Sequence, residues 1–310
     1  MTTEPVFTSW TEQDGKLWGN QPVCVEHRLN RSPLFSMEGL ADLIDRYPRQ
    51  HYSLVQMGAP GQRKLWREGE IGDLSGKEVI ESIAKGRMWL NLRRVAEVDT
   101  RYRDLVNAIF GELSEQVPGF TSTDESIGIL ISSPNAQVYY HADLPGQSLW
   151  QIHGAKRVYI YPAVKPFLAP EHLEDIALYG VEVNMPYEPW YDEHARCFEF
   201  RGGQMLNWPL NAPHRIENLD CLNVSMTMEY WTEEYKRAQI INVANGILRH
   251  RFKRPARSRA THGPVFWGKR VAQRLLRDSP GLKRERKALR PITFKLDRTH
   301  LGQILDLEAA

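Results

Sequence analysis

Residues 127–231 carry the feature that most constrains the fold of this chain. Short runs of β-branched and aromatic residues, at 127–131, 157–161 and 223–231, are separated there by Gly, Pro and Asn. Branched and aromatic side chains pack well on a pleated surface, whereas Gly, Pro and Asn favour turns. Many short strands divided by turns are typical of an antiparallel sandwich or barrel, which this segment therefore predicts.

The same segment contains an H-x-D…H pattern. His141 and Asp143 are two residues apart, and His214 follows 73 residues after His141. On a strand, residues i and i+2 point to the same side, so His141 and Asp143 can bind one ion. Two imidazoles and one carboxylate form the facial triad that holds ferrous iron and leaves open positions. An isolated H-x-D pair is more often an ordinary surface or hydrogen-bonded pair, but the strand-rich context favours metal ligands.

The segments that surround this pattern, 141–143, 150–162 and 202–218, resemble the core of the cupin-like JmjC oxygenases, and in particular the factor-inhibiting-HIF asparaginyl hydroxylase group. The resemblance covers about residues 30–235. It implies a mainly β fold with flanking helices, a double-stranded β-helix (jelly-roll, cupin/JmjC-like) barrel. It also implies that Fe(II) is the cofactor, that 2-oxoglutarate and O2 are co-substrates, and that His141, Asp143 and His214 are the metal-binding catalytic residues.

Lys156 is the fifteenth residue after His141, which is the offset at which the resembled family carries a lysine. On a strand it shares a face with Val158 and Ile160. A lysine on an apolar, inward face is costly to bury without an anion, and the distal carboxylate of 2-oxoglutarate would supply one. The alternative is a lysine at a hairpin end, turned to solvent after Gly154.

Gln147 and Thr227 are the other predicted cofactor-binding residues. Gln147 lies where the resembled hydroxylase places an amide beside the co-substrate. Thr227 shares a strand face with Asn223, Ser225 and Glu229, and such a polar stripe suits either a ligand-lined barrel or a solvent-facing strand. Glu229 departs from the family pattern, which has an amide at this position. A carboxylate there would repel the co-substrate unless it is protonated or paired.

Charge is distributed unevenly along the chain. Between positions 249 and 290 there are fifteen Lys and Arg residues against two acidic residues, although the whole chain has a net charge of only +2. This basic segment predicts an anionic partner. Trp267, Val271 and Leu275 within it have near-helical spacing, which fits a membrane-surface helix or a helix packed on the barrel. The alternatives are nucleic-acid binding, a solvated helical face and a homodimer formed through the C-terminal helix.

The pattern predicts two domains. Residues 1–231 form the barrel with N-terminal bracing helices, and residues 232–310 form a helical, strongly basic extension. Caps and apolar spacing predict helices at 36–47, 76–86, 102–116 and 232–252, with a strand at 88–92. The proline-containing segment 162–198 is predicted to be irregular.

The chain has features expected of a cytoplasmic protein. It contains no apolar run of membrane-spanning length and no signal-peptide pattern at its N-terminus. Its three cysteines lack the spacing of a disulfide framework or a zinc site. A reducing compartment suits both ferrous iron and this cysteine usage.

The leading interpretation is an oxygenase that hydroxylates a C–H bond of a protein side chain, a small molecule or a glycolipid. The alternative is a non-catalytic, cupin-like metal-binding regulator that docks on nucleic acid or an anionic membrane through its basic segment. A cupin enzyme that does not use 2-oxoglutarate would usually have three or four histidines with a glutamate, so the H-x-D…H order argues against it.

Overall fold

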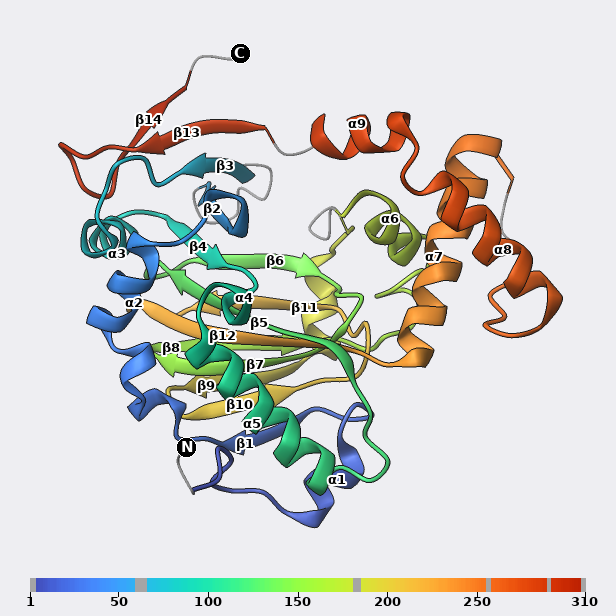
Figure 1. Cartoon of the computed structure of the whole chain (residues 1–310), viewed down its shortest axis with the longest axis horizontal. Coiled ribbons are helices and arrows are strands. Elements are labelled where there is room, and N and C mark those ends of the chain that lie inside the picture. Colours follow the sequence, from blue (N-terminus) through green and yellow to red (C-terminus); the bar gives the residue numbers. More distant parts are fainter. Residues whose placement is uncertain (1–3, 59–65, 181–184, 255–257, 289–290, 308–310) are drawn as a thin grey trace.

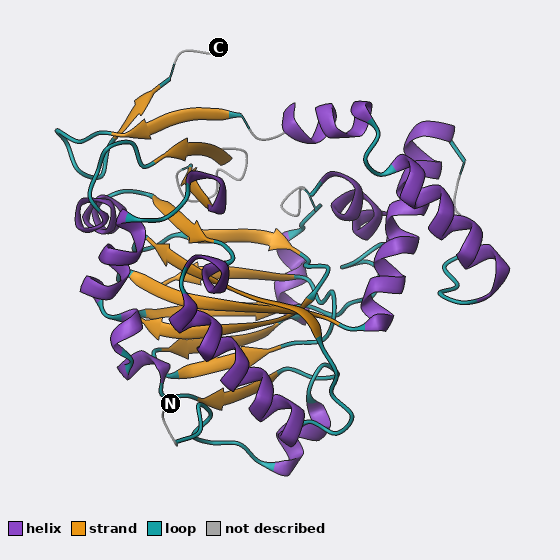
Figure 2. Cartoon of the chain, in the orientation of Figure 1, coloured by secondary structure: helices purple, strands orange, loops and turns teal. Residues whose placement is uncertain are grey.

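Two β-sheets that face each other form the centre of the computed structural model (Figures 1 and 2), which describes residues 4–58, 66–180, 185–254, 258–288 and 291–307. The ten-stranded sheet has the order β1 (Val23–Glu26), β10 (Gln204–Asn207), β7 (Gly146–His153), β12 (Asn223–Trp231), β5 (Thr123–Ser132), β4 (Met88–Leu92), β2 (Tyr52–Met57), β3 (Trp66–Glu70), β13 (Ile292–Leu296) and β14 (Ile304–Asp306). The four-stranded sheet has the order β6 (Gln137–His141), β11 (His214–Asn218), β8 (Ala155–Ile160) and β9 (Arg196–Arg201).

Eight consecutive strands, β5 to β12, wind between the two sheets. Strands β5, β7, β10 and β12 lie in the large sheet, and β6, β8, β9 and β11 lie in the small one. This alternation is the winding of a jelly roll, so the predicted mainly β class is confirmed. The described strands stay in two separate sheets, so the structure shows facing sheets where a closed barrel was predicted.

Helices cover the face of the large sheet that is turned away from the small sheet (Figure 1). The α-helices of the N-terminal part are α1 (Glu12–Leu17), α2 (Met37–Asp45), α3 (Gly76–Lys85), α4 (Val95–Val98) and α5 (Thr100–Gln116), with 3-10 turns at Leu29–Arg31, Pro33–Phe35 and Arg49–His51. The three predicted helices in this part are confirmed as α2, α3 and α5, and β4 confirms the predicted strand. Ser36 and Ser75 cap α2 and α3 with their side chains, which explains why local sequence located these starts.

The alternation of side chains along β12 separates two environments. Val224, Met226 and Met228 are buried in the helix-covered core, whereas Ser225 and Thr227 point into the space between the sheets. That inner space is closed largely by an apolar cluster that both sheets contribute. The polar face predicted for β12 is therefore an inner one, and it is not exposed to solvent.

The connection from β8 to β9 contains structure that the sequence did not predict. Its helix α6 (Pro170–Tyr179) begins with a proline, and a 3-10 helix, Pro189–His194, follows. Proline is favourable in the first turn of a helix, so a residue taken as a break instead marks a start. The prediction of an irregular segment was wrong for these two stretches.

The predicted helix after Thr232 is confirmed as α7 (Glu233–Phe252), with the Thr232 side chain accepting a hydrogen bond from Tyr235 N at 3.1 Å. α7 packs against α6 and against α8 (Gly263–Leu276), which is followed by α9 (Pro280–Ala288). None of the helices in the described ranges combines the length and apolar character needed to span a bilayer.

The C-terminal segment is not wholly helical, because β13 returns to the large sheet and pairs in parallel with β3. Phe294 anchors this return and is fully buried. A Cβ atom at Gly69 would lie 2.4 Å from the Phe294 ring, so the absence of a side chain there makes room for the ring. The Arg67 guanidinium lies 5.6 Å from the centre of the same ring.

We expect Phe294→Ala to lower the free energy of unfolding by about 3–5 kcal/mol, because it removes a buried ring from a site that Gly69 cannot fill. Phe252→Ala is the matched control, since Phe252 is 56% exposed and should change stability by less than about 0.5 kcal/mol. Urea denaturation of both variants measures the difference. Equal losses would contradict a role of β13 in the large sheet.

Candidate metal centre

Three predicted ligand residues meet at one end of the space between the sheets. His141 ends β6 and His214 begins β11, and the two residues are directly opposite in the antiparallel register. Asp143 Oδ2 lies 3.2 Å from His214 Nε2 and 3.9 Å from His141 Nε2. Ligand atoms about 2.1 Å from one ion can be at most about 4.2 Å apart, so both distances fit a shared ion. In the described part of the chain this is the one His/Cys/Asp/Glu group with metal-site geometry.

Backbone carbonyls set the orientation of both imidazoles. His141 Nδ1 lies 2.7 Å from Tyr139 O, and His214 Nδ1 lies 3.0 Å from Ala212 O. A carbonyl oxygen only accepts, so each Nδ1 carries the hydrogen and each Nε2 keeps its lone pair. A hydrogen bond at the distal nitrogen is how proteins fix the tautomer of a metal-binding histidine.

The electrostatics favour the ligand forms of these groups. Burial, reinforced by His214, lowers the pKa of His141 to about 4, so its imidazole is neutral near pH 7. For Asp143, burial acts to raise the pKa, but the two imidazoles more than offset it and the pKa is lowered. The two Nε2 lone pairs and the carboxylate of Asp143 converge on one point, where they attract a cation. The donor set therefore suits a divalent transition metal.

Two further residues position the triad, and the sequence had not marked either of them for this role. The Trp208 ring packs on His214 with the ring centres 4.6 Å apart. Asn211, which has a left-handed backbone (φ 59°), donates its side-chain amide to the carbonyl oxygen of Asp143. Asn tolerates this conformation better than most residues, so Asn211 can hold the turn before β11 against the Asp143 loop.

The triad opens into a pocket of about 260 Å³ between the sheets. Gln147 and Thr227, the predicted co-substrate residues, both line it, as does Glu229. Gln147 Nε2 donates to Glu229 Oε1 at 3.2 Å, so the departing carboxylate has an amide partner.

The pocket wall formed by the large sheet continues to β4 and β3, and sequence reasoning missed this part of it. Trp89 and Asn91 point inward from β4, and Glu68 lines the pocket from β3. Asn91 Oδ1 is buried and accepts no hydrogen bond from the described residues. A Cβ atom at Gly128 would lie 2.9 Å from Thr227 Oγ1 and 3.3 Å from Asn91 Oδ1, so the glycine leaves these two groups accessible to each other. The alternation of β4 was the signal that could have identified Trp89 and Asn91.

Lys156 is buried on the inner face of β8, only 3% exposed, as the alternation predicted. It does not line the pocket of the triad; its ammonium donates to Ser225 Oγ at 2.7 Å. Ser225 donates onward to Gln151 Oε1, also at 2.7 Å, which ties the lysine into a buried polar chain. No carboxylate of the described residues forms an ion pair with Lys156, and burial lowers its pKa to about 7.

A second network lies on the outer side of the small sheet, directly after His214. Arg215 lies over the Tyr159 ring, 3.6 Å from its centre, and pairs with Asp192 and Glu217. Asp192 also accepts a hydrogen bond from Tyr161 at 2.5 Å. The network attaches the connection between β8 and β9 to the back of the metal centre.

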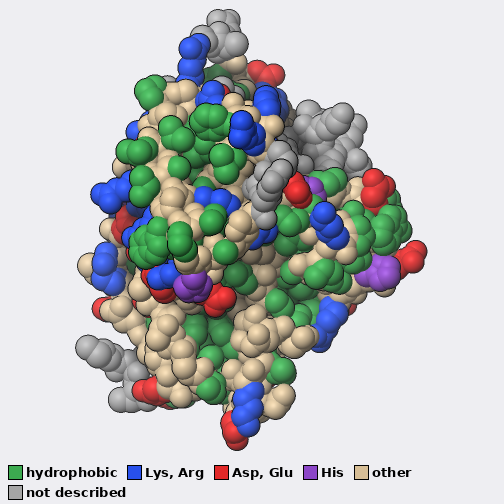
Figure 3. Space-filling model, turned by 90° about the vertical axis from the view of Figure 1, so that its right-hand side faces the viewer, with side chains coloured by type: hydrophobic (Ala, Val, Ile, Leu, Met, Phe, Trp, Pro, Cys, Tyr) green, Lys and Arg blue, Asp and Glu red, His purple; other side chains and the backbone are tan. Residues whose placement is uncertain are grey.

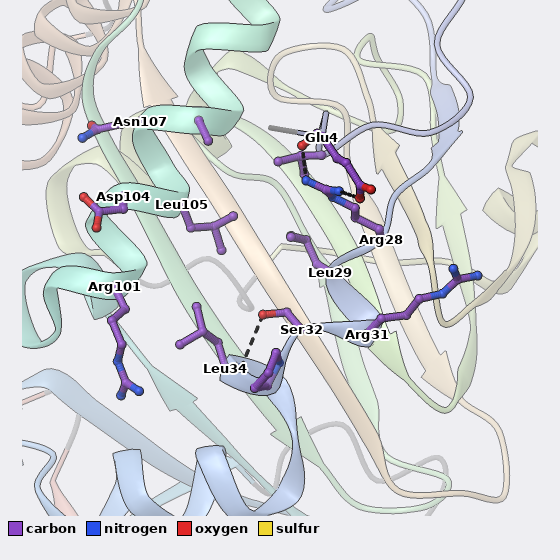
Figure 4. A pocket seen from close by; sticks show the side chains of 13 residues that line it. Glu4, Arg28, Leu29, Arg31, Ser32, Leu34, Arg101, Asp104, Leu105 and Asn107 are labelled. Atoms are coloured by element: carbon purple, nitrogen blue, oxygen red, sulfur yellow. Dashed lines mark hydrogen bonds and ion pairs between the residues drawn. The ribbon is translucent and has the colours of Figure 1, made fainter. Parts of the chain in front are cut away.

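A larger cavity than the pocket of the triad lies elsewhere (Figure 4). It measures about 810 Å³ and lies between α5 and the N-terminal segment. Arg28 is turned toward Glu4 there, while Arg31 and Arg101 point away from each other. Because its charged side chains do not converge, we assign the candidate site from the triad rather than from cavity size.

No model of a known protein family matches the sequence, and no curated protein matches it either. Solved structures do. An X-ray structure of YcfD from Escherichia coli is similar over 89% of this chain and 70% of that chain, with a TM-score of 0.52 and 16% identity. A second structure shows YcfD, described as a ribosomal oxygenase from Escherichia coli, in complex with cobalt and 2-oxoglutarate. It is similar over 94% of this chain and 75% of that chain, with a TM-score of 0.51 and 15% identity. At this identity the likeness shows that the chain shares the fold of YcfD.

Proposed function

We propose that this protein is an Fe(II)- and 2-oxoglutarate-dependent oxygenase that hydroxylates a C–H bond. The observation that carries the proposal is the convergence of His141, Asp143 and His214 on one point inside a jelly-roll fold. Further support comes from YcfD, which has the same fold and was solved with cobalt and 2-oxoglutarate. The finer family likeness, to the asparaginyl hydroxylase group with its double-stranded β-helix barrel, belongs to this proposal as well.

In this proposal the two Nε2 atoms and one carboxylate oxygen of the triad hold the iron on one face. Three ligands on one face leave room for a chelating co-substrate and for oxygen. The bound iron would supply oxygen activation coupled to the decarboxylation of 2-oxoglutarate to succinate. The protein contributes two imidazole lone pairs, an ionised Asp143, and a small pocket between the sheets into which the triad opens.

Lys156 would bind the distal carboxylate of 2-oxoglutarate. A buried ammonium whose polar partner is a serine hydroxyl lacks the negative charge that usually compensates such burial. An incoming carboxylate would supply that charge. Ser225 would then orient the ammonium, and Gln147 and Thr227 would bind the co-substrate from the same inner face, with Gln147 keeping Glu229 hydrogen-bonded.

The wall formed by Trp89, Asn91 and Glu68 would contact the substrate. The free acceptor of Asn91 suits a substrate group that donates a hydrogen bond. We favour a protein side chain, because YcfD is described as a ribosomal oxygenase; a small molecule or a glycolipid is the alternative. We further propose that residues 1–231 carry the chemistry and that residues 232–310 serve attachment.

Glu229 favours one competing function, a metal-binding regulator that does not turn over 2-oxoglutarate, because it adds a carboxylate to the co-substrate pocket. Succinate formation from 2-oxoglutarate in the presence of Fe(II) and oxygen distinguishes the two functions. We expect slow succinate release without substrate, which His141→Ala abolishes and His262→Ala, at an exposed position, preserves. Metal binding without any succinate, across candidate peptides and small molecules, would favour the regulator.

A further inference from the structure

The outer face of α8 exposes a row of large apolar side chains. Trp267, Val271 and Leu275 are 52%, 60% and 74% exposed and follow one another at four-residue intervals, so they form one stripe along the helix. We call these three residues the α8 stripe. Another face of the same helix packs against the rest of the protein, since Phe266 is fully buried. The stripe is therefore additional to what α8 needs for packing.

Arginines accompany the α8 stripe. Arg270, Arg274 and Arg277 are exposed on the same helix, and none of them forms an ion pair with a carboxylate of the described chain. The arginines behind α8 behave differently, because Arg249 and Arg259 both pair with Glu174 at 3.0 Å. The structure thus neutralises part of the basic segment internally and leaves the charge beside the stripe uncompensated.

Figure 3 shows hydrophobic side chains lying among Lys and Arg on the side of the molecule that carries α7 and α8. Between these two helices is a groove of about 620 Å³, whose lining includes Ile247, Leu248 and Leu276. Arg254 and Lys269 also line this groove. This side of the molecule therefore carries two apolar features, the exposed stripe and a separate groove that is itself bordered by cations.

This combination selects one kind of partner. Nucleic acid would use the arginines, but its phosphates have no use for exposed Val271 and Leu275. A second copy of the chain could cover the stripe, but it would bring its own uncompensated arginines against these. An anionic lipid surface satisfies both features, since it offers phosphates to the arginines and an acyl boundary to the apolar residues.

We propose that the α7–α8 side of the protein docks peripherally on anionic membranes. The α8 stripe enters the boundary between headgroups and acyl chains, and Arg270, Arg274 and Arg277 contact the headgroup phosphates. The metal centre lies in the sheets and remains outside the bilayer. Docking would concentrate the enzyme at a membrane surface without any change in its chemistry.

The test is flotation of the full-length protein with vesicles of phosphatidylcholine alone or with about one third phosphatidylserine. We expect binding to the anionic vesicles only, weakening steeply between about 0.05 and about 0.5 M salt. Val271→Glu should weaken binding by at least about tenfold, because it replaces apolar burial with a charge. Val164→Glu is the matched control: Val164 is also 60% exposed but lies between β8 and α6, and its substitution should leave binding unchanged.

Three outcomes would overturn the proposal. The first is equal vesicle binding by Val271→Glu and Val164→Glu. The second is salt-sensitive binding to duplex or single-stranded nucleic acid with no vesicle binding. The third is a wild-type dimer in sedimentation equilibrium that Val271→Glu converts to a monomer, again without vesicle binding. Unchanged metal binding in both variants confirms that the jelly roll is intact.

Discussion

Asp143→Ala is expected to lower the affinity for a divalent transition metal by more than about a hundredfold, since even changes to groups behind the ligands cost 10–100-fold. The substitution removes the one negative charge among the three donors and leaves two imidazoles on an incomplete face. Turnover of 2-oxoglutarate should fall with it. Calorimetric titration with Co(II), together with succinate formation under Fe(II), measures both effects.

Asp73→Ala provides the control, because Asp73 is an exposed carboxylate outside the pocket. It should bind metal like the unmodified protein. Because Asp143 lies in the loop after β6 and not within a strand, removing its carboxylate should not unfold the sheets, and the far-ultraviolet circular dichroism of the variant should be unchanged. Retention of full metal affinity in a folded Asp143→Ala variant would exclude the triad as the metal centre.

Lys156→Met is expected to raise the 2-oxoglutarate concentration needed for half-maximal turnover by roughly 10- to 100-fold, because one charge-assisted hydrogen bond to the co-substrate is lost. Metal affinity should persist, because the triad is untouched. The same variant should be at least as stable as the unmodified protein without ligand, since methionine removes an uncompensated buried charge. A purely structural lysine predicts the opposite result: lower stability with unchanged 2-oxoglutarate affinity. Lys77→Met, at an exposed position, is the matched control.

The pH dependence of 2-oxoglutarate binding provides a second readout of Lys156. Burial lowers the pKa of this ammonium to about 7 in the free protein, with a smaller opposing influence from Cys221. A bound carboxylate favours the protonated form and raises the pKa, so binding takes up a proton above pH 7. Affinity should be constant below pH 7 and fall as pH rises, approaching about tenfold per pH unit.

Lys156→Met should abolish this slope. The stability of the ligand-free protein should depend on pH in the opposite direction. In the unfolded chain Lys156 keeps its proton up to its usual pKa of 10.5, whereas in the folded protein it releases the proton near pH 7. The free energy of unfolding should therefore rise with pH across that window, and a flat 2-oxoglutarate affinity between pH 7 and 9 would argue against the lysine as anchor.

Local sequence was sufficient to predict those features that depend on residues close together in the chain. The H-x-D spacing identified His141 and Asp143 as candidate ligands of one ion, although β6 ends at His141 and Asp143 lies in the loop after it; strand alternation placed Lys156 on the inner face of β8. Caps located helices, as Ser36 and Thr232 show. These features depend on the period of a strand or on one turn of a helix, so neighbouring residues determine them.

Only the tertiary structure decided which distant segments meet. Asn91 and Thr227 lie on either side of Gly128 in the large sheet, Lys156 meets Ser225 from the opposite sheet, and β13 pairs with β3 although more than 200 residues separate them. Such contacts depend on strand order and register, which short-range patterns do not encode, because a strand sequence fits many partners equally well. The sequence thus determined the chemistry of the candidate metal site and the faces of its strands. The shape of its pocket and the attachment of the C-terminal segment follow from long-range packing, which takes form only when the two sheets come together.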